Sequence, residues 1–394
     1  MKNLLFLSLR LPYPPHRGDR IRAFHFIRGL QEKYRIALAA FFEKRSELDN
    51  LGPLREMCAE VYAAPHSAWK GRARAAAGLF GNEPLQNAMW RSTRMANALR
   101  KAIDESAPDA VHASLFRMGR YVAEEPLPKL LDLCDSMAMN LRRRMERERN
   151  PLNRPLLKIE EKRARRYEAE IIKAFDRTVV IAADDRDAIH ETAPDARLDI
   201  VSQGVDLDYF SPSRPERNGP PTVLFTGTMN YFPNTDAAMF LVHDTLPKVR
   251  GAFPGARLIL AGSSPPRSLR RLDGRNGVVV TGAAPDLRPY FEKADIFAAP
   301  MFCGSGVQTK NLEAMAMKLP VVTTPLGRQG CGARNGHELL EANDQDKFAQ
   351  EVISLLKDRD RQRALAEAGR RYVEREHGWS VITERLCRIY DEIL

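Results

Sequence analysis

The sequence predicts an α/β protein made of two doubly wound domains, each built on a parallel sheet. Two observations carry this prediction. Short apolar runs alternate with segments of helical periodicity along the whole chain, and most runs are continuous Val, Ile, Leu and Ala. Continuous runs are typical of strands that are covered on both faces. In addition, 394 residues suit two hydrophobic cores better than one.

The expected strands form two groups with a linker between them. The first group is 3–9, 35–42, 109–114, 129–135 and 177–183, and the second is 222–228, 257–263, 277–283, 295–300 and 320–324. Between them, the stretch SPSRPERNGPPT (211–222) contains four prolines, and we place the linker at about 203–221. The first domain is then 1–202 and the second 203–377. Periodicity alone is compatible with other two-domain α/β arrangements.

Composition narrows the class of protein only in part. Charged residues make up 28% and hydrophobic residues 44%, which are globular values. A formal charge of +10 fits nucleic acid, an anionic membrane surface or phosphorylated small molecules. No base-reading motif accompanies this charge, so we expect no nucleic-acid partner. The five cysteines lack the spacing of a zinc site or a disulfide framework, which favours a reducing cytoplasm. No apolar run approaches the roughly 20 residues that span a bilayer.

The stretch GSGVQTKNLEAMAMKLPVVTT (304–324) has the pattern of a ligand-binding loop that leads into a helix, expected over about 308–317. Glycines allow the backbone to approach a ligand closely, and the unpaired amides of a helix start favour a phosphate. Lys310 adds a cation, and the Glu313 carboxylate suits paired ribose hydroxyls. These features indicate a nucleotide site. The alternative is a helix entry whose small residues serve packing alone. The loop residues are Gly304, Ser305, Gly306, Val307, Gln308 and Thr309.

Five stretches, in the right order, resemble the family 4 retaining glycosyltransferases, which have the two-domain GT-B fold. They are LEAMAMKLPVV within 304–324, QGVDLDYFSP (203–212), VLFTGTMNYFPNTDA (223–237), VTGAAPDLRPYFEKADIFAAP (280–300) and LPYPPHRGDRIRAFHFIRGL (11–30). The resemblance covers nearly the whole chain. It is closest to the sugar transferases associated with bacterial exopolysaccharide and PEP-CTERM loci.

The resemblance implies a nucleotide-diphosphate-sugar donor in the second domain and a glycan acceptor, expected to be lipid-linked, in the first. By position, Glu313 would bind the ribose, the Gly306–Lys310 segment would hold the diphosphate, and backbone near Gly282–Asp286 would read the base. Gly227 and Asn230, in the turn after the first strand of the second domain, complete the expected donor site. The family implies front-face departure and attack without an enzyme nucleophile.

Two departures from the family pattern leave an alternative open. Ser305 stands where the family has the first glutamate of its Glu-x7-Glu motif, and the turn TGTMNYFPN lacks the usual Arg and Lys. The chain is then either an active transferase or a catalytically weak or inactive sugar-nucleotide-binding protein in a polysaccharide assembly complex. We expect no metal cofactor, because amide dipoles and cations can stabilise a departing diphosphate. The DLD at 206–208 is expected to be a turn.

The first domain supplies further candidates, each with a structural alternative. Gly18 and Asp19 precede a helix whose Arg20 and Arg22 either contact a phosphate across the cleft or are solvated helix charges. His112, expected at a strand end facing the cleft, is a candidate general base or a structural histidine. Asp135 also ends a strand and has the same two interpretations. With Lys310 and Glu313, these two residues are the candidates for catalysis.

Three helical regions complete the sequence prediction. Residues 66–101 hold seven Lys or Arg, one acid, and interleaved Trp69, Phe80 and Trp90. This composition suits docking at the cytoplasmic face of an anionic membrane, or else an ordinary helix whose aromatic residues pack inward. Residues 141–170 are expected to form one long solvated helix. By resemblance, the terminal segment 378–394, with Trp379, crosses back to the first domain.

Overall fold

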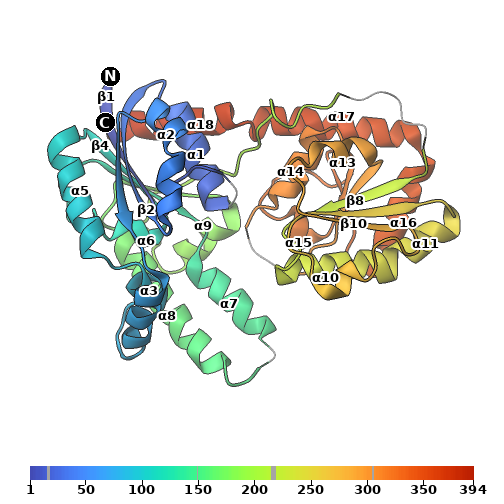
Figure 1. Cartoon of the computed structure of the whole chain (residues 1–394), viewed down its shortest axis with the longest axis horizontal. Helices are drawn as coiled ribbons and strands as arrows, with labels where there is room; N and C mark the ends of the chain where they lie inside the picture. Colours follow the sequence, from blue (N-terminus) through green and yellow to red (C-terminus); the bar gives the residue numbers. More distant parts are fainter. Residues whose placement is uncertain (16–17, 149, 214–218, 304–305) are drawn as a thin grey trace. The chain divides into compact units, whose positions relative to one another are not determined.

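The computed structural model describes residues 1–15, 18–148, 150–213, 219–303 and 306–394. The chain divides into two compact units (Figure 1). The N-terminal unit comprises Met1–Val201 and Ile382–Leu394, and the C-terminal unit comprises Ser202–Val381. Each unit has its own hydrophobic core around one parallel sheet. The predicted fold class, two Rossmann-like α/β domains, is therefore confirmed.

The described residues of the N-terminal unit form a seven-stranded sheet with the order β3-β2-β1-β4-β5-β6-β7. Its strands are β1 (Lys2–Ser8), β2 (Tyr34–Phe42), β3 (Glu60–Pro65), β4 (Ala110–Ser114), β5 (Lys129–Cys134), β6 (Arg177–Val180) and β7 (Leu198–Ile200). Its helices are α1 (Gly18–Leu30), η1 (Arg45–Asn50), α2 (Gly52–Met57), α3 (Ala68–Ala77), η2 (Gly78–Phe80), α4 (Leu85–Met89), α5 (Thr93–Ser106), α6 (Phe116–Gly119), α7 (Met137–Arg147), α8 (Arg154–Ile172) and α9 (Ala183–His190). The last helix, α18 (Trp379–Ile393), belongs to this unit from Ile382 onwards.

The described residues of the C-terminal unit form a six-stranded sheet with the order β10-β9-β8-β11-β12-β13. Its strands are β8 (Thr222–Thr226), β9 (Arg257–Ala261), β10 (Val278–Gly282), β11 (Ile296–Ala299), β12 (Val321–Thr323) and β13 (Leu340–Glu341). Its helices are α10 (Phe232–Phe240), the π-helical η3 (Leu241–Thr245), α11 (Leu246–Ala252), α12 (Arg267–Arg270), α13 (Arg288–Lys293), α14 (Thr309–Ala316), α15 (Pro325–Arg328), α16 (Gln345–Lys357) and α17 (Arg359–Glu376).

The central strands contain continuous runs of apolar residues that are buried on both faces of the sheet. In β1 the run Leu4–Leu7 is buried, and in β8 all five residues are buried. Such strands have no polar face because helices cover both sides of the sheet. Every pairing within the two sheets is parallel, including β1 with β2 and β4, and β8 with β9 and β11.

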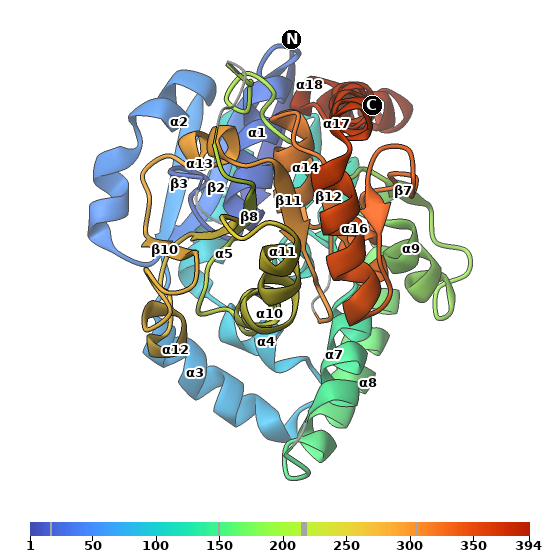
Figure 2. The same ribbon diagram turned by 90° about the vertical axis from the view of Figure 1, so that its right-hand side faces the viewer.

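Residues 141–170 do not form the single solvated helix that the sequence predicts. Helix α7 ends before Glu148, and α8 starts at Arg154 with a proline in its first turn. Pro151 lies between them, and proline is tolerated at a helix start but not in a helix interior. One face of α8 is buried, including Leu157 and Ala164. The pair forms a helical hairpin that projects from the N-terminal unit in both views (Figures 1 and 2).

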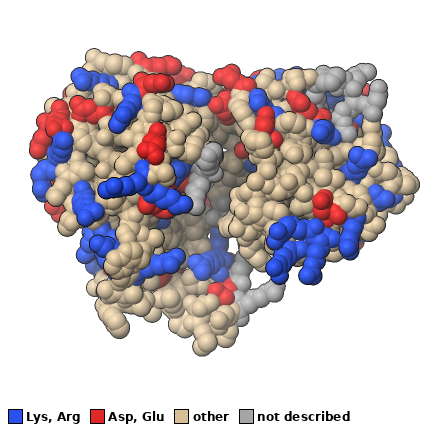
Figure 3. Space-filling view, in the orientation of Figure 1, with Lys and Arg blue, Asp and Glu red and all other residues tan. Residues whose placement is uncertain are grey.

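The projecting end of the N-terminal unit has a distinct surface. In Figure 3 its lower end is mostly tan, and Lys and Arg side chains lie directly above it. The end of α3 and the tip of the α7–α8 hairpin make up this region in Figures 1 and 2. No helix built from the described residues is both long and apolar enough to cross a bilayer.

Candidate functional site

The strand order of the C-terminal sheet defines where a ligand site is expected. Chain order runs outward from β8 to β9 and β10 on one side, and from β11 to β12 and β13 on the other. The sheet therefore has its topological switch point between β8 and β11, and open α/β sheets bind ligands beyond the carboxyl ends of strands at that point. The turn after β8 leads into α10, and the loop after β11 leads into α14. Lys310 and Glu313 both lie in α14.

Lys310 joins the two helix starts at the switch point. Its Nζ donates a hydrogen bond to Oδ1 of Asn234, in the first turn of α10, at 2.5 Å. The ammonium also lies 4.8 Å from the centre of the Phe225 ring, in β8, and 3.7 Å from the sulfur of Met301. Asn234 is itself fixed, because its Nδ2 donates to the carbonyl of Thr228 at 3.0 Å. The lysine is thus held in place by neutral groups.

The surroundings of this site change the acidity of both charged residues. Burial lowers the pKa of Lys310 from 10.5 to about 8, and the nearby Glu313 carboxylate acts in the opposite direction. Burial raises the pKa of Glu313 from 4.5 to about 7, against the effect of Lys310. Both side chains remain partly exposed, so they can meet a ligand. The surrounding protein groups solvate the Lys310 ammonium poorly. An anion that binds beside this ammonium is therefore stabilised.

The ends of β8 and β9 each need a glycine. Gly262, after β9, has φ +150°, and a Cβ there would lie 1.9 Å from the carbonyl oxygen of Gly227. Gly227 has φ +156°, and its Cβ would lie 2.7 Å from Nδ2 of Asn234. Both positions lie at the carboxyl ends of adjacent strands. Small residues here let the backbone and Asn234 pack close enough to anchor Lys310.

Hydrogen bonds brace the loop that carries Lys310. The hydroxyl of Thr323, in β12, donates to the carbonyl of Ala299 at 2.8 Å, and the hydroxyl of Thr324 donates to the carbonyl of Met301. Asn311, fully buried beside Lys310 in α14, donates from Nδ2 to the carbonyl of Gly327 at 2.9 Å. These bonds tie the end of β11 to the end of β12, and the first turn of α14 to α15. The site is therefore built on rigid elements.

Most of the predicted loop residues lie beside Lys310. Gly306 has φ +74°, the left-handed conformation that glycine adopts easily. The carbonyl of Val307 accepts from the Thr309 amide at 3.0 Å, and the carbonyl of Gln308 accepts from the Asn311 amide at 2.9 Å. Gly304 and Ser305 lie outside the described residues.

The other predicted donor residues lie farther along the same sheet edge. Asn230 is exposed in the turn after β8. Gly282 ends β10, two strands from β8, with φ +70° and open space where a Cβ would be. The Asp286 carboxylate accepts hydrogen bonds from Arg288 at 2.8 Å and from the Tyr209 hydroxyl at 3.0 Å. Hydrogen bonding to Arg288 lowers the pKa of Asp286 to about 2, so its side chain is already occupied within the protein.

In the N-terminal unit, Arg22 has neither of its expected roles. Its side chain is 1% exposed, and its guanidinium donates to both oxygens of Asp132, at 2.7 and 3.1 Å, and to the carbonyl of Val201 at 2.9 Å. The prediction of a ligand contact or a solvated charge is therefore wrong. Arg22 faces the sheet from α1, and a buried guanidinium requires a carboxylate partner.

His112 is also not where the sequence placed it. It lies in the middle of β4 with no exposed surface, and its ring stacks on Phe6 at 4.2 Å. Its Nδ1 is 2.7 Å from the hydroxyl of Tyr390 in α18. Burial lowers the pKa of His112 to about 4. The expected position at a strand end facing a cleft is wrong, because the central strand is covered on both faces.

The remaining N-terminal candidates lie near the carboxyl edge of their sheet. Gly18 starts α1, and Asp19 pairs with Arg10 at 2.8 Å. Arg20 pairs with Glu47 at 3.3 Å. Asp135, just after β5, accepts from the Asn140 amide at 2.6 Å, and burial raises the pKa of Asp135. These groups are mostly engaged with one another.

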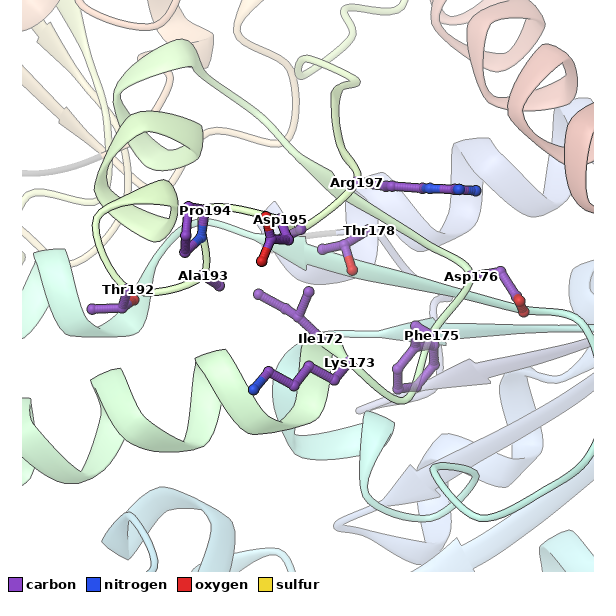
Figure 4. Close-up of a pocket in the computed structure, with 11 residues that line it drawn as sticks. Ile172, Lys173, Phe175, Asp176, Thr178, Thr192, Ala193, Pro194, Asp195 and Arg197 are labelled. Carbon is purple, nitrogen blue, oxygen red and sulfur yellow. The ribbon is translucent and has the colours of Figure 1, made fainter.

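A separate pocket of about 450 Å³ lies at the amino end of β6 (Figure 4). Its lining residues include Phe175, Thr178, Lys173 and Arg197. Figure 4 shows the Lys173 and Arg197 side chains pointing away from each other. The cations do not converge, and the pocket is at the strand end opposite to the one where such sheets bind ligands. It therefore lacks the features of a diphosphate site.

Comparison with solved structures identifies the fold. The crystal structure of Anabaena HepE in complex with UDP matches with a TM-score of 0.69 at 12% identity, over 99% of this chain and all of that one (100%). The same protein has been solved with UDP-glucose. The chain thus has the GT-B fold, with two Rossmann-like domains in one polypeptide.

Comparison with known sequences then narrows the class of protein. Residues 220–358 match the family model described as glycosyl transferases group 1, and this segment contains Asn234, Lys310 and Glu313. The chain is 33% identical over 208 residues to the GDP-mannose-dependent monoacylated alpha-(1-6)-phosphatidylinositol monomannoside mannosyltransferase of Corynebacterium glutamicum, covering 48% of this chain and 55% of that protein. It is 29% identical over 143 residues to an uncharacterized 44.6 kDa protein in the cps region of Klebsiella pneumoniae, covering 34% and 37%. The chain spans about half or less of these relatives.

Sequence reasoning missed the residue that anchors Lys310. Asn234 lies in the run YFPNTDA, where proline marks a helix start and a polar residue in the first turn is unremarkable. The available signal was the neighbouring Gly227, since a glycine at a strand end indicates a close approach of some other group. The approaching group is the Asn234 side chain.

Proposed function

We propose that this protein is a retaining glycosyltransferase of the family 4 type. It would transfer a sugar from a nucleotide-diphosphate-sugar donor to a lipid-linked glycan acceptor in bacterial exopolysaccharide biosynthesis. The observation that carries the proposal is Lys310, held by Asn234 at the switch point of a sheet whose sequence matches the group 1 transferase model. The binding of UDP and UDP-glucose by HepE supports the donor class.

The proposed roles follow from the chemistry of sugar transfer. The bond between the anomeric carbon and the donor diphosphate breaks, a bond to the acceptor hydroxyl oxygen forms, and the hydroxyl proton passes to the departing diphosphate. Negative charge grows on the departing diphosphate. The Lys310 ammonium and the amides at the start of α14 would stabilise that charge without a metal. Glu313 would bind the ribose, with the backbone of Gly282–Asp286 beside the base.

Donor binding can be tested without knowing the acceptor. The wild-type protein is mixed with UDP, UDP-glucose, GDP or GDP-mannose, and the unfolding midpoint is measured. A nucleotide present at 100 times its Kd stabilises by about 2.7 kcal/mol. We expect this stabilisation to be lost in Lys310→Met and in Asn234→Ala, and to be kept in the control Lys347→Met, whose side chain is 67% exposed.

Two outcomes bear on the proposal in different ways. An equal thermal shift in wild type and Lys310→Met would contradict the donor site. Donor binding that depends on Lys310, with no sugar transfer to lipid-linked acceptors and no donor hydrolysis, would favour the catalytically inactive sugar-nucleotide-binding protein. We place the protein in the cytoplasm, at the inner face of the membrane, as part of the same proposal.

A further inference from the structure

Six large apolar side chains of the N-terminal unit are exposed on α3, on the η2 turn that follows it, and at the start of α8 or just before it. Trp69 of α3 is 69% exposed, Phe80 of η2 is 97% exposed and Leu152, before α8, is 84% exposed. Leu79, Leu156 and Ile159 are also exposed. We call these six residues the apolar tip. Exposing this much apolar surface in water is unfavourable, and patches of this kind mark interaction sites.

The η2 turn and α8, which both carry residues of the apolar tip, are joined by hydrogen bonds. The guanidinium of Arg163 donates to the carbonyl of Leu79 at 2.7 Å, and the Glu160 carboxylate accepts from the backbone amide of Leu85 at 2.8 Å. Leu156, Ile159 and Arg163 are three and four residues apart, so they share one face of the helix. The η2 turn therefore lies on the helix face that carries the exposed leucine and isoleucine.

Exposed cations flank the apolar tip. Lys70 and Arg72 are exposed on α3, and Lys158 and Lys162 are exposed on α8. The acid of the 66–101 segment, Glu83, is paired with Arg91 and Arg120 and does not offset them. Figure 3 shows Lys and Arg directly above the tan lower end of this unit.

We propose that the apolar tip and these cations dock on an anionic phospholipid membrane. The apolar side chains would enter the interfacial layer, and the cations would remain at the level of the lipid phosphates. A projecting tip with one residue almost fully exposed fits a deformable lipid surface. The surface extends the 66–101 segment by the 152–163 segment, which the sequence alone presents as solvated. It deepens the proposed function, because docking would give access to a lipid-linked acceptor.

Tryptophan fluorescence provides a direct measurement of docking. The chain has three tryptophans, and Trp90 and Trp379 are 4% and 6% exposed. A change in emission on adding vesicles therefore reports mainly on Trp69. We expect a blue shift with vesicles of phosphatidylcholine containing phosphatidylglycerol, a much smaller one with pure phosphatidylcholine, and a decrease as salt is added. No blue shift with the anionic vesicles overturns the proposal.

Variants separate the apolar and the electrostatic contributions. Phe80→Ser with Leu152→Ser should lower binding in vesicle co-sedimentation by roughly tenfold or more. Lys70→Glu with Arg72→Glu should lower it by a similar factor, since each cation near the surface contributes about 1 kcal/mol, which is about fivefold. Unchanged binding in either variant overturns the proposal. All four side chains are exposed, so the variants should fold, which the unfolding midpoint checks.

A matched control makes the same change in charge in the other unit. Lys347→Glu with Arg363→Glu changes two side chains that are 67% and 76% exposed in the C-terminal unit. Binding should stay at the wild-type value, and an equal loss in this control would show that net charge alone drives binding, against the proposal. Nucleotide-induced stabilisation is measured on the same samples. Docking without nucleotide binding would count against the donor site only, and the reverse result against docking only.

Discussion

Replacing Lys310 by methionine should stabilise the unliganded protein near neutral pH. Holding the ammonium in its site lowers its pKa from 10.5 to about 8, which corresponds to about 3 kcal/mol of unfavourable free energy. Methionine has a similar length and no charge, and it would lie against the Phe225 ring and the Met301 sulfur. The substitution leaves Oδ1 of the buried Asn234 without the lysine donor, which costs about 1–3 kcal/mol.

The expected net gain is therefore about 1 kcal/mol, or about 2–4 °C in Tm for a domain of this size. Its pH dependence gives the sharper test. Below pH 8 the lysine is protonated in both the folded and the unfolded protein, and the full cost is present. Between about pH 8 and 10.5 the folded protein releases the proton before the unfolded chain does, so the wild type gains stability as the pH rises.

The assay is urea unfolding of both proteins from pH 7 to about pH 10. The advantage of Lys310→Met should be largest below pH 8 and should turn into a deficit at high pH, where only the lost hydrogen bond remains. The control Lys347→Met, at an exposed ion pair, should show no such trend. A stability difference that is constant over the whole range would refute the argument that burial controls this lysine.

Three further predictions concern the buried framework. Asp132→Asn should cost about 3–5 kcal/mol in urea unfolding, because Arg22 loses its buried carboxylate, and Arg22→Met combined with Asp132→Leu should restore much of that. His112→Gln should reduce the loss of stability as the pH falls from 6.5 to about 4, by up to about 3 kcal/mol, because only the unfolded wild type takes up the proton in that window. Gly262→Ala should lower Tm through a backbone clash worth about 1–3 kcal/mol or more, whereas Gly251→Ala, with open space in α11, should be neutral or stabilising.

The sequence predicted the central strands of both sheets and the edge strand β10, and it missed three other strands. The missed strands, β3, β7 and β13, all lie at sheet edges. Most of their residues are not fully buried, and no residue of β7 is buried. The continuous apolar run that identifies a central strand therefore has no reason to occur there. An edge strand forms because it pairs with one neighbouring strand, and its own sequence does not show that neighbour.

The candidate site was predictable where it depends on local backbone chemistry. A glycine-containing loop after a strand and before a helix predicts the region of Lys310 and Glu313, because both the loop and the helix start are local features. The contact from Asn234 joins residues 76 positions apart, so local pattern could not give it. The same limit applies to Glu83, whose partner Arg120 lies 37 positions away.

For Arg22 and His112, burial determines a role that the residue type alone does not indicate. Both are polar residues at positions where a helix start and a strand end suggested access to ligand. The structure instead joins them through Asp132, which binds Arg22 and lies 3.9 Å from Nε2 of His112. A histidine at this distance from a carboxylate usually gains proton affinity, yet its pKa falls to about 4 because desolvation outweighs the carboxylate and Arg22 opposes protonation as well. Asp132 is thus committed to Arg22, and the neutral His112 remains a packing partner of Phe6 and a hydrogen-bond partner of Tyr390.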